Sequence, residues 1–145
     1  MMPQRTILVA DDIGNRTPVG KNRSQAIYNV SSFLARKLKC DIDLLYVEDM
    51  KTYPFRVFNS SRIEVWHAQN REKLEEVSKR YQIPMHCFLK SGSPAEQILK
   101  ALRTKTSPEL VVMGTQGRKG LRRLLVGSVA EEVIRHAQRP VLVVG

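Results

Sequence analysis

Met113-Gly114-Thr115-Gln116-Gly117, followed after nine residues by Gly127-Ser128-Val129, is the stretch on which the interpretation of this chain rests. The apolar run Leu110-Val111-Val112-Met113 leads into it, and a helix-like segment from Ser128 to Ala137 follows it. Glycines let backbone N–H groups approach a ligand, and a helix N-terminus adds unpaired donors and a positive dipole end. This context predicts a polyphosphate-binding loop between a strand and a helix. In the alternative interpretation, Gly114 and Gly117 only shape a turn and Ser128 only caps the helix.

Outward from this loop, short aliphatic and β-branched runs predict five strands of a parallel sheet that is buried on both faces. The runs are Thr6–Ala10, Ile42–Val47, Met85–Leu89, Leu110–Met113 and Val141–Val144. Between them, apolar residues recur at intervals of three and four and predict four helices. The helical stripes are Ile27, Val30, Leu34 and Leu38; Ile63, Trp66, Leu74, Val77 and Tyr81, with Asn70 as a polar member; Ala95, Ile98, Leu99 and Leu102; and Ala130, Val133, Ile134 and Ala137. The alternation predicts an open α/β sheet that binds its ligand beyond the carboxyl ends of the strands.

The glycine spacing resembles the signature of the universal stress protein family, in particular its ATP-binding branch: Gly-x-x-Gly, nine residues, then Gly-Ser or Gly-Thr. The match falls on Gly114, Gly117, Gly127 and Ser128. The first strand with its terminal aspartate and the ending Arg139–Val144 are also similar to the family. The resemblance implies a single Rossmann-like, adenine nucleotide alpha hydrolase-like domain over residues 1–145. Its five strands would lie in the order 3-2-1-4-5, with helices on both faces of the sheet.

The resemblance also implies which residues bind the nucleotide. Asp12 would hold the nucleoside, and Ala10 and the backbone of Val47 would flank adenine. Met113 and Gly114 would lie near the ribose. The phosphates would be bound by Gly117, Gly127, Ser128 and Val129. The ligand would be ATP, with Mg or Mn on its phosphates. Residue chemistry agrees, because a carboxylate accepts hydrogen bonds from ribose or adenine and glycine N–H groups hold phosphates. Asp11 is the alternative to Asp12; otherwise it caps the strand or faces solvent.

The segment Ile13 to Arg23 departs from the family pattern, in which the first helix follows the aspartate almost at once. It is rich in glycine, asparagine and arginine, and it must emerge beside the nucleotide site. A surface loop is the first interpretation of such a composition. Alternatively, it covers the ligand, closes the pocket, or recruits phosphates through Arg16, Lys21 or Arg23.

Basic residues exceed acidic ones, with 24 Lys and Arg against 14 Asp and Glu and a net charge of +10. Four of them, Arg118, Lys119, Arg122 and Arg123, lie between Gly114 and Ser128. They would strengthen polyphosphate binding or contact a nucleic-acid backbone. Nucleic acid is the second candidate partner, because the run has no aromatic residue on which bases could stack. A scaffold protein that binds no nucleotide is the third interpretation.

The sequence contains no pattern typical of a dedicated enzyme. The glycine loop lacks the Gly-Lys-Ser/Thr ending of a P-loop, so slow ATP hydrolysis is the most that we expect. His67 and His136 are predicted on helix surfaces and His86 on a strand, without ligand or triad spacing. We therefore assign no catalytic residue and no metal ligand.

Composition and the terminal strand complete the expectations. Cys40 and Cys87 lack metal-ligand spacing and are interpreted as reduced, largely buried thiols. No apolar run approaches the roughly 20 residues that span a bilayer, so we expect a cytoplasmic protein without membrane contact. The resemblance implies a homodimer in which Val141 to Val144 would cover its apolar sheet edge. The expected function is that of a regulatory sensor of adenine nucleotide in a stress response.

Overall fold

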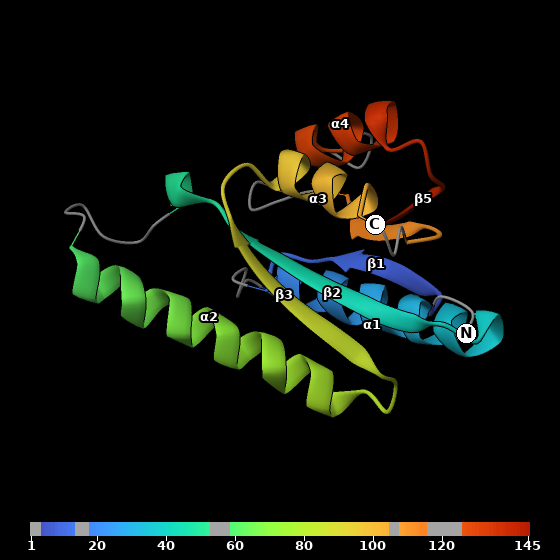
Figure 1. The fold of residues 1–145 in the computed structure, drawn as a ribbon, viewed down its shortest axis with the longest axis horizontal. Helices are drawn as coiled ribbons and strands as arrows, with labels where there is room; N and C mark the ends of the chain where they lie inside the picture. The colour runs from blue at the N-terminus through green and yellow to red at the C-terminus, as the bar shows by residue number, and fades with distance from the viewer. Residues whose placement is uncertain (1–3, 14–17, 53–58, 105–107, 116–125) are drawn as a thin grey trace.

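The computed structural model describes residues 4–13, 18–52, 59–104, 108–115 and 126–145, in which five parallel strands form one sheet (Figure 1). The strands are β1 Thr6–Ala10, β2 Asp41–Glu48, β3 Met85–Ser91, β4 Val111–Gly114 and β5 Val141–Val144. Their order across the sheet is β3-β2-β1-β4-β5, and every neighbouring pair is parallel. The predicted fold class and strand order are confirmed.

The helices cover both faces of the sheet. They are α1 Pro18–Leu38, α2 Ser60–Arg80, α3 Pro94–Leu102 and α4 Ser128–His136, with a short 3₁₀ turn, η1, at Met50–Thr52. α3 and α4 lie on one face, whereas α1 and α2 lie on the other (Figure 1). The chain therefore moves outward from β1 to β3 on one face and then crosses to β4 and β5 over the other. This reversal places the switch point of the sheet between β1 and β4.

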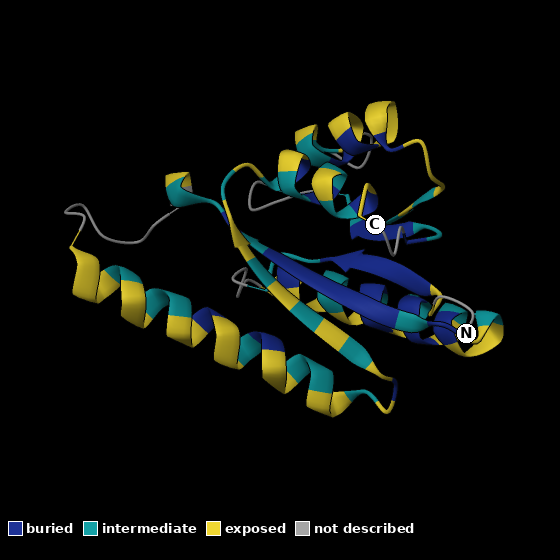
Figure 2. Ribbon diagram, viewed as in Figure 1, coloured by how far each residue is buried: buried dark blue, intermediate teal, exposed yellow. Residues whose placement is uncertain are grey.

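Successive residues of the central strands point to opposite faces and so build two hydrophobic cores. In β1, Ile7 and Val9 pack in the core that contains Ile27 of α1, whereas Leu8 belongs to the core that contains Val133 of α4. The central strands are accordingly buried along their length (Figure 2). Complete burial of one such aliphatic side chain contributes about 1.5–3 kcal/mol relative to its exposed state. A strand buried on both faces is apolar at most positions, which explains the hydrophobic runs in the sequence; Thr6, Asp43 and Glu48 are buried polar exceptions.

The edge strand β3 is covered less completely than the centre of the sheet. Its residues alternate between half-buried and exposed, and the side chain of Phe88 is 41% exposed (Figure 2). The half-buried Cys87 and Leu89 pack toward the core shared with α1 and α2. The opposite face of β3 is therefore open at Phe88.

Two sequence expectations about the helices need correction. α1 begins at Pro18, so residues 18–23 are helical rather than part of a loop that extends to Arg23. Proline is favoured in the first turn of a helix, because its φ is already suitable and its missing N–H is not needed there. Ile134, expected on the buried stripe of α4, is 49% exposed, since it lies one residue beyond the buried Val133 and therefore about 100° around the helix.

Candidate functional site

A cavity of about 380 Å³ lies beyond the ends of β1 and β4, at the switch point of the sheet. Ala10, the last residue of β1, is paired with Met113 of β4, so the two strands end side by side. Because β2 and β5 lie outside them and the helices approach from both faces, the chain leaves a crevice at this point. Open parallel sheets bind their ligands at this position.

The structure brings eight of the nine predicted binding residues to this cavity. They are Ala10, Asp12, Val47, Met113, Gly114, Gly127, Ser128 and Val129. The ninth, Gly117, lies outside the described residues, as do Arg16 and the basic positions Arg118 to Arg123. The residues come from β1, β2, β4 and α4, and only the order of the strands makes them neighbours.

α4 presents its N-terminus to the cavity. Its N-cap is Gly127, whose φ of +86° is in the region that favours glycine, and Ser128 is the first helical residue. The interpretation in which Ser128 only caps the helix does not hold, because Ser128 is not the N-cap and no side-chain hydrogen bond caps this end. Unpaired N–H groups of a helix end and the associated dipole favour an anion.

Asp11 and Asp12 both line the cavity, but Asp11 also contacts α1. The Tyr28 hydroxyl donates a hydrogen bond to Oδ2 of Asp11 over 2.6 Å. Burial raises the pKa of Asp11, while its hydrogen bonds with Tyr28 and Ser24 act in the opposite direction. The pKa of Tyr28 is also raised, first by burial and then by the neighbouring Asp11 carboxylate. Asp11 therefore lines the cavity and is at the same time tied to α1 through Tyr28.

The remaining cavity wall comes from residues that the sequence analysis did not assign to the site. They are Leu45, Tyr46, Asp49, Pro94, Ile98, Thr115 and Ala130. Asp49 directly follows β2, and Thr115 directly follows β4. Their positions just after predicted strands could have indicated that both residues belong to the site. Pro94 and Ile98 reach the cavity only because of the way α3 crosses the sheet, which the sequence does not indicate.

Arg23 also lines this cavity, although it belongs to α1 on the far side of β1. A Cβ added to Gly114 would lie 2.7 Å from Cδ and 3.1 Å from Nε of Arg23. The arginine side chain therefore occupies the space that a side chain at position 114 would need. Of the three residues considered for phosphate recruitment, Arg23 is a described residue that reaches the cavity; Arg16 is not described, and Lys21 does not line the cavity.

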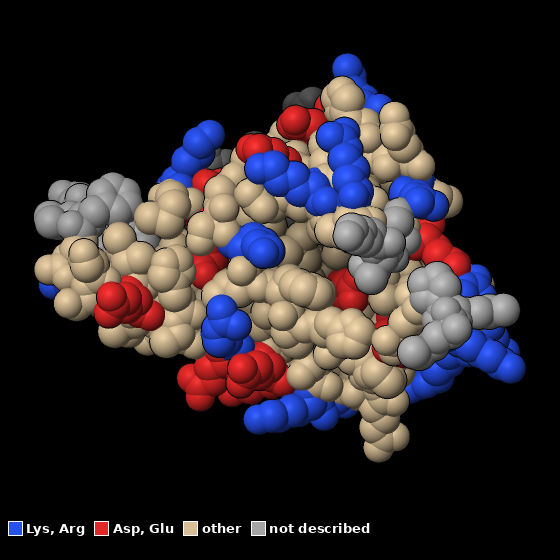
Figure 3. Space-filling view, in the orientation of Figure 1, with Lys and Arg blue, Asp and Glu red and all other residues tan. Residues whose placement is uncertain are grey.

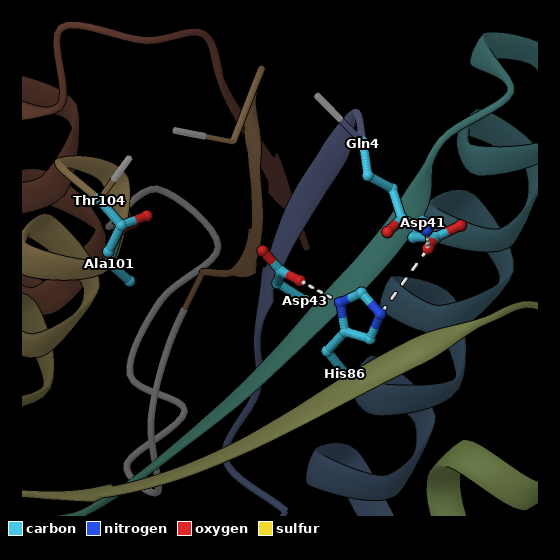
Figure 4. A network of polar contacts seen from close by, with 6 residues as sticks. All are labelled: Gln4, Asp41, Asp43, His86, Ala101 and Thr104. Carbon is cyan, nitrogen blue, oxygen red and sulfur yellow. Dashed lines mark hydrogen bonds and ion pairs between the residues drawn. The ribbon is translucent and has the colours of Figure 1, made fainter. Parts of the chain in front are cut away.

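A second cavity of about 360 Å³ lies between α3 and the open face of β2 and β3. Asp43 contributes to its wall, and His86 on β3 contacts this carboxylate through Nδ1 at 3.1 Å. Nε2 of the same ring lies 3.7 Å from Oδ2 of Asp41 (Figure 4). His86 is thus a strand residue, as predicted, and it is held between two carboxylates.

His67 is not the plain helix-surface residue that its position suggested. Its Nδ1 contacts Oε2 of Glu48, which is the last residue of β2 and is fully buried. The other carboxylate oxygen, Oε1, has no hydrogen-bond partner among the residues that the structure describes. His136, by contrast, lies exposed on α4 as expected. Within the described part of the chain, no group of three His, Cys, Asp or Glu side chains is arranged to hold a metal ion.

Charged side chains are spread over the surface rather than gathered in a single field on the visible face. In Figure 3, basic side chains form separate groups on that face, with acidic side chains among them and uncharged surface between them. Some form ion pairs along helices, such as Lys100 with Glu96 at 2.8 Å and Arg135 with Glu131 at 2.7 Å. Part of the basic excess is therefore locally compensated. None of the helices in the described residues has the length and apolar character needed to cross a membrane.

The family model and the relatives that match this chain all indicate the same family. The model of the "Universal stress protein family" matches residues 4–145. A universal stress protein of Methanocaldococcus jannaschii is 33% identical over 117 residues, which cover 77% of this chain and 68% of the relative.

Solved structures share the fold over nearly the whole chain. The structure of the hypothetical protein MJ0577 has a TM-score of 0.76 and 25% identity, covering 99% of this chain and 96% of the other. An Archaeoglobus fulgidus universal stress protein solved in complex with dAMP has a TM-score of 0.63 and 17% identity, with coverage of 99% and 100%. A universal stress protein solved in complex with cAMP has a TM-score of 0.60 and 17% identity, with coverage of 99% and 98%.

Proposed function

Because this chain belongs to the universal stress protein family, we propose that its cavity at the switch point binds an adenine nucleotide, and that ATP is the ligand, as in the ATP-binding branch. One observation carries the proposal. The Gly127 turn and the N-terminus of α4 face the same cavity as Asp12, which follows β1. The start of α4 thus supplies hydrogen-bond donors for a phosphate chain, and Asp12 supplies a hydrogen-bond acceptor for a nucleoside in the same cavity.

Each part of a nucleotide finds a suitable chemical environment in this arrangement. The N–H groups at Gly127, Ser128 and Val129 suit phosphate oxygens, and the Asp12 carboxylate suits the ribose hydroxyls or the adenine amino group. The apolar wall between them includes Ala10, Val47 and Met113, which suits the adenine ring and the ribose. Mg or Mn would take its ligands chiefly from the phosphates, in keeping with the preference of these ions for phosphate oxygens and water.

Two structural relatives support the class of ligand. Their structures were solved with dAMP and with cAMP, both of which contain adenine and phosphate. In this chain the bound nucleotide would act as a signal rather than as a substrate. A ligand at about 100 times its dissociation constant adds about 2.7 kcal/mol to the stability of the state that binds it. Occupancy of the cavity would thereby report nucleotide concentration.

The first test identifies what the purified protein carries. The protein is isolated without added nucleotide and denatured, and the released small molecules are analysed by mass spectrometry. Thermal unfolding is then followed as ATP and magnesium are titrated. The proposal expects an adenine nucleotide in the extract and a melting temperature that rises with ATP concentration. An empty extract together with an unchanged melting temperature would refute it.

A matched pair of glycine variants locates the binding. Gly127 and Gly92 both have positive φ, at 86° and 132°, so alanine imposes backbone strain at either position. Gly127 lines the cavity, whereas Gly92 lies between β3 and α3 and does not. We expect both variants to melt at lower temperature, and only Gly127→Ala to lose most of the response to ATP. An equal ATP response in the two variants would contradict the assignment of Gly127.

A further inference from the structure

Arg23 reaches the candidate site from α1, and no glycine signature accounts for it. Its Cγ, Cδ and Nε all lie within 3.3 Å of the point where Gly114 would carry a Cβ. The side chain therefore packs against the end of β4, and it forms part of the cavity wall. The absence of a side chain at position 114 is what permits this close approach.

The charge around the cavity makes this position significant. The described lining residues include three carboxylates, on Asp11, Asp12 and Asp49, and a single basic side chain, that of Arg23. A phosphate chain placed among these carboxylates would be repelled, since like charges interact unfavourably at short distance in a partly buried site. Arg23 is the described cavity residue that can offset this repulsion.

Arg23 already interacts electrostatically with one of these carboxylates. Its positive charge favours the ionised form of Asp11, which the Tyr28 hydroxyl also contacts. Arg23 is half-buried and forms part of the wall of this cavity. A planar guanidinium carries N–H groups in a fork that matches phosphate oxygens.

We propose that Arg23 is a phosphate-binding residue of this site and makes it selective for phosphorylated forms of adenosine over adenosine itself. The inference rests on the proposed function of the cavity. Arg23 would contact the phosphate chain from the side of α1 and β4, opposite the N–H groups at the start of α4. One contribution is a side-chain charge, and the other comes from backbone N–H groups.

The test compares ligands that share adenosine and differ in phosphate. Isothermal titration calorimetry measures the affinities of ATP and adenosine for the wild type, Arg23→Gln, Arg23→Lys and Arg36→Gln. Arg36 lies exposed on the same helix and does not line the cavity, so its variant removes the same charge at a different place. Each titration is repeated at low and high salt.

The expected result is specific to phosphate. Arg23→Gln should weaken ATP binding by about 10- to 100-fold, which is the scale of a hydrogen bond between charged groups, and leave adenosine affinity within about twofold. Arg23→Lys should retain part of the ATP affinity, and Arg36→Gln should retain all of it. The salt dependence of ATP binding should be weaker in Arg23→Gln than in the wild type.

Two results would overturn the inference while leaving nucleotide binding intact: undiminished ATP affinity in Arg23→Gln, or equal losses for ATP and adenosine. The second would mean that Arg23 shapes the cavity without contacting phosphate. If the wild type bound neither ligand, the proposed function itself would fail, and the role of Arg23 with it. Adenosine affinity in Arg23→Gln also verifies that the variant has folded.

Discussion

At the scale of single residues, Asp11 shows how two adjacent carboxylates acquire different surroundings. The chain is still extended where it leaves β1, since the N–H of Asp11 bonds to the carbonyl of Leu45 on β2. Successive side chains in an extended chain point to opposite faces, so Asp11 continues the α1 side, where Tyr28 lies, and Asp12 continues the side of Leu8 and Ala10. The environment of each carboxylate follows from the face of the sheet to which its place in the alternation assigns it.

This placement predicts an unusual pH dependence of stability. Burial holds the pKa of Asp11 above its ordinary value near 4, so above that pH the folded protein retains a proton that the unfolded chain has released. The free energy of unfolding should therefore fall as pH rises through the window that begins near 4, until Asp11 ionises in the folded state. Urea unfolding of Asp11→Asn and wild type between pH 4 and 7 should show the variant gaining relative stability with increasing pH.

Tyr28→Phe is the companion variant in the same experiment. It removes the hydroxyl that donates to the Asp11 carboxylate and should destabilise the protein by about 1–3 kcal/mol near neutral pH, with a smaller effect at pH 4. If the stability difference between Asp11→Asn and wild type were constant across this pH range, Asp11 would not have the raised pKa on which the prediction depends.

Residue roles could be predicted from the sequence only where chemistry and chain position agreed. Gly114 ends a strand, and Gly127 and Ser128 begin a helix, so their local context was enough to assign these three residues to one site; all three line the cavity. The pairing of Glu48 with His67 was not predictable, because it joins the end of β2 to a helix that begins only at Ser60. Nothing in the spacing of those two residues indicates that α2 lies beside β2.

At the scale of elements, α1 is stabilised by the stripe that it buries. Ile27 is fully buried, whereas Phe33 on the same helix is 59% exposed despite its larger apolar side chain. Hydrophobic periodicity correctly predicted Ile27 as part of this stripe. The prediction from composition was wrong only about the residue at which the helix begins. Residues 18–23 include glycine, asparagine and proline, which are common in loops. They are helical here because Pro18 stands in the first turn, where proline is favoured, and because Gly20 is buried by packing.

The contrast between these two residues gives a direct prediction. Ile27→Ala should lower the free energy of unfolding by about 2–5 kcal/mol, because it removes buried methylene groups and leaves a cavity against the sheet. Phe33→Ala should change it by no more than about 0.5 kcal/mol. Urea denaturation of the two variants measures the difference. Comparable losses would mean that Phe33 is covered in solution, for example by a second molecule.

At the scale of the whole molecule, the sheet ends in two different edges, β3 and β5. The carbonyl of Pro140, just before β5, accepts a hydrogen bond from Val111, and the carbonyl of Val144 accepts one from Thr115, just after β4. Because backbone groups alternate along a strand, the N–H and C=O of Val141 and Val143 point away from β4. β5 therefore has a row of backbone groups available for pairing with another chain.

The homodimer remains a prediction, and this geometry makes it testable without disturbing the fold. Val143→Pro removes a donor that points outward, so the pairing of β5 with β4 should survive while pairing with a second copy is lost. Sedimentation equilibrium should give a dimer for the wild type, a monomer for Val143→Pro and a dimer for the control Val143→Thr. A dimer that persists in the proline variant would place the interface elsewhere.

The central position of β1 has a consequence for how the chain acquires this structure. Residues 6–10 enter the middle of the sheet, yet one of their two partners is β4, and Arg5 pairs with Glu109, 104 residues further along. During synthesis, one side of β1 therefore stays open until most of the chain has emerged, which makes folding slow and leaves an apolar strand edge exposed. A nascent chain arrested before residue 111 should accordingly need protection by chaperones. Release of residues 111–114 is the step that closes the sheet and, with it, completes the cavity.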